Sequence, residues 1–246
     1  MSRFCFLAVA AFVLAASLLA VAQSPVAHAP DGGTQVVFSS ISIPPAKNAP
    51  FQATVTLEVT RHLADGGTVT IQNHRMVVRD SQGNIYQERR TLVPPGQEPR
   101  VRSIEISSPV THTKYFCDPK LTQCELRTYN EEAEDATVPA VLSGDENPNF
   151  KRLDLGTKTI EGVDAVGTRE TLTIPAGARG NSAPMENTRE YWYSPQLQLN
   201  LRVLRLTPLE GDQSLAVTNL QLTEPDPQLF VIPPNCKIVD KRSGEQ

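Results

Sequence analysis

The chain has 246 residues, of which 27 are acidic and 23 are basic, and its formal net charge is −4. A mildly acidic chain without basic runs lacks the electrostatic footprint of a nucleic-acid-binding protein. With 39% hydrophobic and 20% charged residues it has the composition of an ordinary globular protein, and it is long enough for one sizeable core or two small ones.

The first residues have the pattern of an export signal. Arg3 is the only charge before Asp31, and the run Phe4–Ala22 is rich in Ala, Leu, Val and Phe. It ends in Ala20-Val21-Ala22, the small-x-small pattern that a signal peptidase recognises. We therefore expect removal of residues 1–22, a periplasmic or secreted mature protein, and no transmembrane segment after cleavage. Because the run is just long enough to span a bilayer, an uncleaved anchor is the alternative.

Residues 23–50 are predicted to form an extended, proline-rich leader with one short strand, over 36–43. From Phe51 to Thr60 apolar and polar residues alternate strictly. Alternation with a period of two places one set on a core face and the other towards water. Asp65-Gly66-Gly67 follows, and Asp-Gly supplies the positive φ angles that a tight hairpin turn requires. The domain is therefore expected to begin with an antiparallel hairpin.

The return strand of this hairpin, from Val69 to Asp80, contains a break in the alternation. Val69 and Ile71 occupy odd positions, whereas Met76 and Val78 occupy even positions. Two explanations are open at this stage: a β-bulge that resets the faces, or a strand that passes from one core to another.

Further short strands are expected, separated by turns rich in Pro and Gly. They cover residues 85–92, 102–106, 114–117, 124–129, 153–160, 163–167, 168–174, 189–193, 199–206 and 215–222. After the signal no segment keeps an apolar period of 3.6, so little helix is expected. The predicted fold class is mostly β: one curved antiparallel sheet or half-barrel, with two stacked small sheets as the alternative.

The domain organisation follows from these segments. Residues 51–240 are predicted to form a single antiparallel β domain, and residues 241–246 a tail. The stretch 130–150 is acidic and contains Pro139 and Pro148, so it is predicted to be an irregular excursion that could divide the domain into two halves.

Three cysteines remain after the signal, and export places them where disulfides persist. Cys117 and Cys124 bracket a six-residue turn between two strands, a spacing at which their β carbons can meet across a hairpin. We predict a structural disulfide between them, which stabilises the fold by roughly 2.5 kcal/mol in the chain-entropy model. Cys236 is then either free and packed after Phe230 or paired between molecules.

The last sixty residues resemble the closing strands of the periplasmic lipoprotein-carrier fold, as in the Lol-pathway carriers and the sensor domain of the sigma-E regulator. The resemblance rests on an ordered series of segments: Glu190-Tyr191-Trp192-Tyr193-Ser194-Pro195, Leu199–Leu204, Val217-Thr218-Asn219-Leu220, and Pro225-Asp226-Pro227-Gln228-Leu229-Phe230 with Pro233 and Pro234. In that group a curved sheet forms a half-barrel around an apolar cavity that holds acyl chains. One difference is that the carriers begin with an amphipathic helix, which residues 23–50 are too rich in proline to form.

The mature chain is also similar to secreted proteins of soil bacteria that have no assigned activity. The shared segments are 79–83, 155–162 and 173–177. The carrier resemblance implies an exported protein that holds a lipid or another apolar small molecule. Tyr191, Trp192 and Phe230 would then line a cavity; the simpler interpretation is that they fill a β core.

The sequence contains no recognisable catalytic, cofactor-binding or metal-binding pattern. A nucleophile elbow, a Walker loop and a dinucleotide-binding loop are absent, and no histidine has zinc-ligand spacing. We therefore predict a non-enzymatic binding protein without a cofactor. The alternative is a structural or protein-interaction module of the cell envelope that meets a partner protein through its sheet edges.

Overall fold

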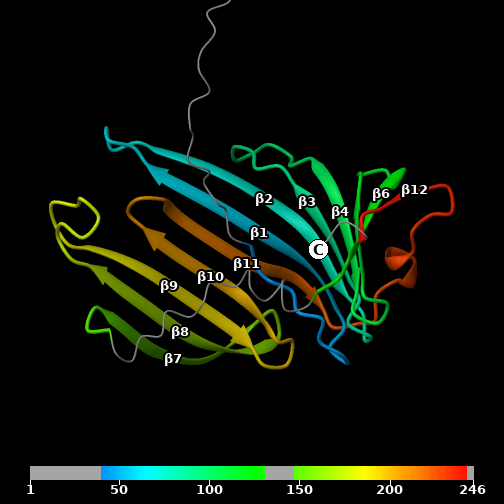
Figure 1. Ribbon diagram of the computed structural model, residues 1–246. Helices are drawn as coiled ribbons and strands as arrows, with labels where there is room; N and C mark the ends of the chain where they lie inside the picture. Colours follow the sequence, from blue (N-terminus) through cyan, green and yellow to red (C-terminus); the bar gives the residue numbers. More distant parts are fainter. Residues whose placement is uncertain (1–39, 131–146, 243–246) are drawn as a thin grey trace, which may run out of the picture. The chain divides into compact units, whose positions relative to one another are not determined.

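The computed structural model describes residues 40–130 and 147–242, which form one twelve-stranded sheet and a short 3-10 helix (Figure 1). The elements are β1 (Phe51–His62), β2 (Thr68–Arg79), β3 (Ile85–Arg90), β4 (Val101–Ser108), β5 (Thr113–Cys117), β6 (Gln123–Thr128), β7 (Phe150–Ile160), β8 (Val163–Ile174), β9 (Met185–Ser194), β10 (Leu199–Thr207), β11 (Gly211–Gln221), η1 (Pro227–Phe230) and β12 (Lys237–Asp240). The predicted signal, residues 23–39 of the leader, residues 131–146 of the excursion and residues 243–246 of the tail lie outside the described residues.

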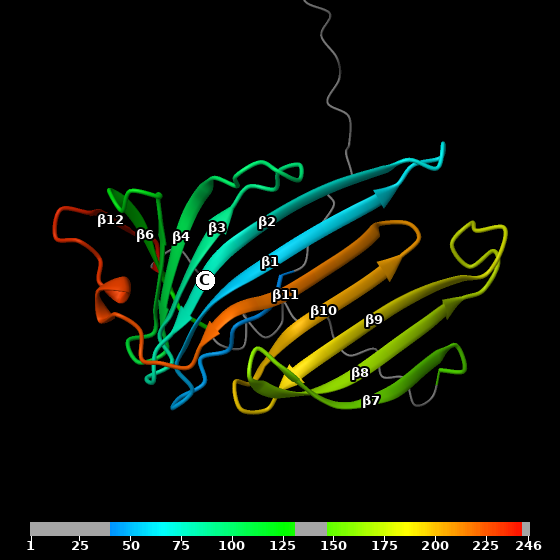
Figure 2. The ribbon, with the colours of Figure 1, turned by 180° about the vertical axis from the view of Figure 1, so that it is seen from behind.

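The sheet joins two meanders at its centre. Its strand order is β12-β6-β5-β4-β3-β2-β1-β11-β10-β9-β8-β7, so β1 pairs with β11, β12 pairs with β6, and all other neighbouring strands are consecutive in the chain. Figures 1 and 2 show this order from the two sides of the sheet. The sheet is curved and not closed into a barrel. The predicted fold class is confirmed, and the alternative of two stacked sheets is wrong.

Three local features differ from the sequence predictions. The short strands expected over 163–167 and 168–174 form one strand, β8, and residues 40–43 of the expected leader strand are not in a strand. β12 was not predicted; it has four residues and pairs with β6, in parallel, whereas the other strand pairs are antiparallel. β12 is too short to show an alternation of apolar and polar residues, so its position depends on its pairing with β6.

Among the described residues, no helix is long and apolar enough to cross a membrane.

β2 passes between two hydrophobic clusters, which explains the break in its alternation. Its pairing with β1 runs from His62↔Thr68 to Phe51↔Arg79 without a register shift, so the β-bulge explanation is wrong. Val77 and Val78 are adjacent, both 0% exposed, and belong to different clusters. Because successive side chains of a strand point to opposite faces, β2 is buried on both faces of the sheet.

The first cluster gathers around the centre of the sheet. Its buried members are Ile41, Phe51, Ala53, Val55, Leu57, Val59, Val77, Ile160, Val163, Ala165, Trp192, Leu197, Leu199, Leu201, Val203, Leu215 and Val217. The alternating residues of β1, from Phe51 to Val59, are 1–8% exposed and form its largest contribution. The strict alternation of this strand therefore does mark a core face, as predicted.

The second cluster lies on β2 to β6 and includes residues of the C-terminal segment. Its buried members are Val78, Tyr86, Ile104, Ile106, Cys117, Cys124 and Cys236, with Leu229, Phe230 and Ile232 partly buried against them. η1 is capped by Asp226, whose side chain accepts a hydrogen bond from the Gln228 amide. The C-terminal segment thus supplies the apolar side chains that cover this part of the sheet.

Two buried arginines of β2 fasten the segment before β1 to the sheet. Arg79, 0% exposed, donates hydrogen bonds to the carbonyl oxygens of Pro44 at 2.7 Å and Ala49 at 2.9 and 3.0 Å. Arg75, 5% exposed, donates to Ser40 Oγ at 2.7 Å. Within the predicted leader, the residues from Ser40 on are therefore held against the sheet, although no strand forms there.

Candidate functional site

An apolar row crosses four strands at the centre of the sheet. Tyr191 of β9 lies opposite Val203 of β10, Val203 opposite Leu215 of β11, and Leu215 opposite Leu57 of β1. Directly opposed residues of antiparallel strands share one face. Val203, Leu215 and Leu57 are 4%, 2% and 8% exposed, and Tyr191 packs against them, half-buried. The row is therefore a continuous apolar band perpendicular to the strands.

The next row on the same face is polar and carries two positive charges side by side. This row lies two residues further along each strand than the apolar row. In it Arg189 lies opposite Arg205, Arg205 opposite Gln213, and Gln213 opposite Val59. Like charges that face each other across a sheet destabilise it. The pair formed by Arg189 and Arg205, which we call the arginine pair, is therefore an arrangement that packing alone does not favour.

Arg205 holds an unused hydrogen-bond donor. Its Nε atom is buried and has no hydrogen-bond partner among the described residues. Burial lowers the pKa of Arg205, and so does the charge of Arg189, whereas a hydrogen bond with Tyr191 and the Glu210 carboxylate act in the opposite direction. The carboxylate nearest along the row, Glu170, lies opposite Arg189 and already accepts hydrogen bonds from Arg152 at 3.0 and 3.2 Å. An anionic group placed at the arginine pair would satisfy the donor and offset the repulsion.

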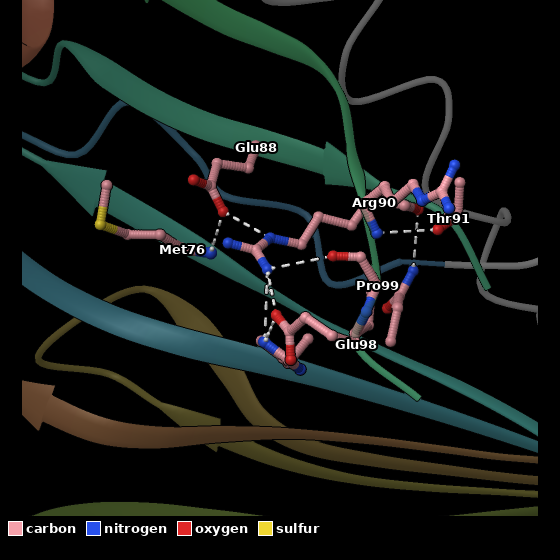
Figure 3. A network of polar contacts seen from close by, with 9 residues as sticks. Met76, Glu88, Arg90, Thr91, Glu98 and Pro99 are labelled. Atoms are coloured by element: carbon pink, nitrogen blue, oxygen red, sulfur yellow. Dashed lines mark hydrogen bonds and ion pairs between the residues drawn. The ribbon is translucent and has the colours of Figure 1, made fainter. Parts of the chain in front are cut away.

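A second polar cluster, around Arg90 of β3, pairs its charges with one another. Arg90 donates to Glu88 at 2.8 Å, to Glu98 at 3.0 Å and to the Pro99 carbonyl at 3.3 Å (Figure 3). Glu88 also accepts from the Met76 amide at 3.3 Å. Hydrogen bonds from Arg90 to Glu88 raise the pKa of Arg90. Since its charges pair with one another, this cluster fastens the loop before β4 to β2 and β3 and offers little to a ligand.

Trp192 is a packing residue of the sheet. Its side chain is 9% exposed, its Nε1 donates to Glu190 at 2.8 Å, and the Lys158 ammonium lies 3.3 Å from the ring centroid. A Cβ atom on Gly167 would lie 2.7 Å from two of the ring carbons. The ring therefore occupies the space left by a glycine in the neighbouring strand, a recurring arrangement in sheets.

The three aromatic residues singled out from the sequence do not form one group. Trp192 belongs to the first hydrophobic cluster, and Tyr191 packs against it beside the arginine pair. Phe230 is partly buried in the second cluster, with the C-terminal segment. Of the three, Tyr191 is the one that the structure places at the candidate site; a ligand-lining role for it remains a prediction.

The cysteines of the second cluster show the predicted bridge. Cys117 and Cys124 are opposed residues of β5 and β6 and form a disulfide with an S–S distance of 2.03 Å. Cys236 is a buried free thiol. Its Sγ lies 3.2 Å from Sγ of Cys124. Of the two sequence expectations for Cys236, the first agrees with this position: the thiol is packed after Phe230.

The sequence patterns did not single out the two buried arginines of β2 or the arginine pair. Arg75 and Arg79 stand four residues apart on one strand and therefore share a face, yet they lie among polar and apolar residues alike. Arg189 and Arg205 are 16 residues apart in the sequence, on consecutive strands, and the register of β9 with β10 brings them together. A buried role could have been inferred for Arg79 alone, because it occupies a core-facing position of β2 directly before the turn Asp80-Ser81-Gln82-Gly83.

No protein-family model and no curated protein matches the chain. It is similar to several solved structures. One is an uncharacterized conserved protein from Thermus thermophilus, at 14% identity and a TM-score of 0.41 over 78% of this chain and 91% of that one. Another is MucB of Pseudomonas aeruginosa in its complex with MucA, at 14% identity and a TM-score of 0.39 over 79% and 59%.

A third similar structure is a LolA superfamily protein from Nitrosomonas europaea, at 11% identity and a TM-score of 0.30 over 74% of this chain and 90% of that one. The chain thus spans about three fifths of the MucB chain and most of the other two. A LolA superfamily protein, from the group that the C-terminal segment resembles, is thus among the similar solved structures.

Proposed function

We propose that the chain is an exported, non-enzymatic binding protein for an amphipathic anion, that is, an apolar molecule that carries a carboxylate or phosphate. The anionic group would bind at the arginine pair, and the apolar body would lie against Tyr191, the half-buried end of the apolar row. The observation that carries the proposal is the buried Nε of Arg205, which has no partner among the described residues, on a residue that lies opposite a second arginine.

The chemistry of the two rows supports this ligand class. A guanidinium group presents donors in a planar fork that matches a carboxylate or phosphate. In most small-molecule sites, a few polar groups fix the orientation of a ligand whose remaining surface contacts apolar side chains. The arginine pair and the neighbouring apolar row combine these features on one face of the sheet.

The test is a titration with cis-parinaric acid, a fluorescent fatty acid. We expect saturable binding to the wild-type protein, and binding about tenfold or more weaker to Arg205→Gln, because a charge-assisted hydrogen bond contributes roughly 1.5–3 kcal/mol. Arg169→Gln is the matched control. Its guanidinium pairs with Glu190 at 2.8 Å and its side chain is 46% exposed, so its affinity should equal that of the wild type.

A fatty alcohol of equal chain length separates the two parts of the proposal. If the alcohol competes as well as the acid and Arg205→Gln changes neither, the anion site is wrong although the apolar row binds. Absence of binding by acid and alcohol alike would contradict the whole proposal. Native mass spectrometry after gentle extraction from a bacterial periplasm extends the test to natural ligands.

The alternative of an interaction module that uses its sheet edges receives less support. The long edge strand is β7, and its pairing with β8 shifts register between Asp154 and Gly156. Lys151, Arg152 and Lys158 also lie along it. Bulges and charged side chains are features by which natural proteins discourage pairing at an edge.

A further inference from the structure

The sulfur atoms of all three described cysteines converge at one point of the second cluster. Cys117 and Cys124 are opposed across β5 and β6, and β12 pairs with the other side of β6. In this register Ile238 lies opposite Cys124, which places Cys236 just beyond the start of the pairing. The Cys236 Sγ lies 3.2 Å from the Cys124 Sγ, within the disulfide's immediate surroundings.

The position of Cys236 is fixed by the backbone on both of its sides. Its amide donates to the Pro233 carbonyl at 2.9 Å, and the next amide, of Lys237, donates to the Thr122 carbonyl at 2.9 Å. Cys117, Cys124 and Cys236 are 2%, 0% and 9% exposed. The free thiol therefore meets the disulfide inside the protein, where a thiol from solution has little access.

We propose that the three cysteines form an intramolecular thiol–disulfide exchange site. The Cys236 thiolate attacks Sγ of Cys124, a new Cys124–Cys236 bond forms, and the Cys117–Cys124 bond breaks. Cys117 leaves with the electron pair and takes up the proton that Cys236 has lost. The step needs no oxidant or reductant, since one disulfide and one thiol are present before and after it.

The two disulfide arrangements tie different parts of the fold together. The Cys117–Cys124 bond closes the β5–β6 hairpin, whereas a Cys124–Cys236 bond would link β6 to the C-terminal segment that covers the second cluster. Burial, together with the Asp118 carboxylate, raises the pKa of the Cys236 thiol. Because only the thiolate attacks, exchange starting from the hairpin disulfide is slow at neutral pH. The site is independent of the binding face proposed above.

Trypsin can separate the three cysteines completely, because cleavage after Lys114, Lys120, Arg127, Arg205 and Lys237 places them on the peptides 115–120, 121–127 and 206–237. The wild-type protein is incubated without added thiol at pH 7 and at about pH 9, alkylated with N-ethylmaleimide under acidic denaturing conditions, digested and analysed by mass spectrometry. We expect a peptide 121–127 linked to 206–237, with the maleimide on Cys117, to accumulate at the higher pH. If the maleimide is found only on Cys236 after hours of incubation at the higher pH, the proposal is wrong.

Two single variants test the same contact without depending on the exchange rate. Cys117→Ser should form the Cys124–Cys236 disulfide quantitatively under mild oxidation. Cys124→Ser, the matched control, removes the shared sulfur and should keep two free thiols. If Cys117→Ser folds, as judged by circular dichroism, and yet keeps two free thiols, the proposed site is wrong.

Discussion

Replacement of Arg79 by alanine is expected to lower the free energy of unfolding by about 4 kcal/mol. The side chain is 0% exposed and its guanidinium donates to three carbonyl oxygens, those of Pro44, Ala49 and Leu197. Each polar group left without its partner in a buried position costs roughly 1–3 kcal/mol. The guanidinium also lies 4.9 Å from the Phe51 ring centroid, so the truncation removes packing as well. Unfolding by urea, followed through the fluorescence of the sole tryptophan, Trp192, measures this loss.

Two further substitutions show whether the carbonyl contacts cause the effect. Arg79→Met keeps the side-chain volume and removes only the donors, so most of the loss should remain. Arg202→Ala, on the exposed part of β10, should change stability by no more than about 0.5 kcal/mol. A loss below about 1 kcal/mol for both Arg79 variants would contradict the role of this arginine as the fastening of residues 44–49 to the sheet.

Replacement of Trp192 by alanine is expected to cost about 3–5 kcal/mol, the usual range for truncating a buried tryptophan. The ring is 9% exposed and lies against Gly167 and Leu155. Gly167→Ala in the wild-type protein should cost about 2 kcal/mol, because the new Cβ would approach two ring carbons to 2.7 Å and the Leu155 Cβ to 2.9 Å. Chemical denaturation followed by far-ultraviolet circular dichroism gives both values.

The double variant decides between packing and any other role of the ring. With Trp192 replaced by alanine, Gly167→Ala should cost clearly less, since the two ring contacts are gone and only the 2.9 Å approach to the Leu155 Cβ remains. Ser214→Ala, at an exposed position of β11, is the control for general effects of substitution. Equal costs of Gly167→Ala in both backgrounds would show that the tryptophan does not occupy the space above the glycine.

The strands and hairpins were predictable because their signals are local. β1 alternates strictly, and its apolar set is the buried set, from Phe51 to Val59. The Cys117–Cys124 bridge was predictable for the same reason, because a short turn between two strands brings their ends together. The alternation break in β2 was visible too, although its cause was not, since a bulge and a change of core leave the same pattern in the sequence.

Several contacts of the fold join residues that are distant in the sequence. Arg79 meets a carbonyl 118 residues away, at Leu197, and Cys236 meets a sulfur 112 residues away, at Cys124. In the candidate site the arginine pair lies on consecutive strands, whereas the pairing of β1 with β11, which adds Leu57 to the apolar row, joins residues about 160 positions apart, such as Thr56 and Ala216. The periodicity of a strand reveals which side chains avoid water, but it does not reveal which strand lies beside it.

The sequence by itself therefore determined the class of the protein: alternating strands, the turns between them, one local disulfide and an N-terminus with the features of an export signal. Only the tertiary structure decided that the two meanders join at β1 and β11, that the end of β2 is buried on both faces, and that Cys236 lies beside Cys124. The physical reason is one of range. Turn chemistry and alternation act over a few residues, whereas strands and side chains more than a hundred residues apart come together only when the whole sheet has formed.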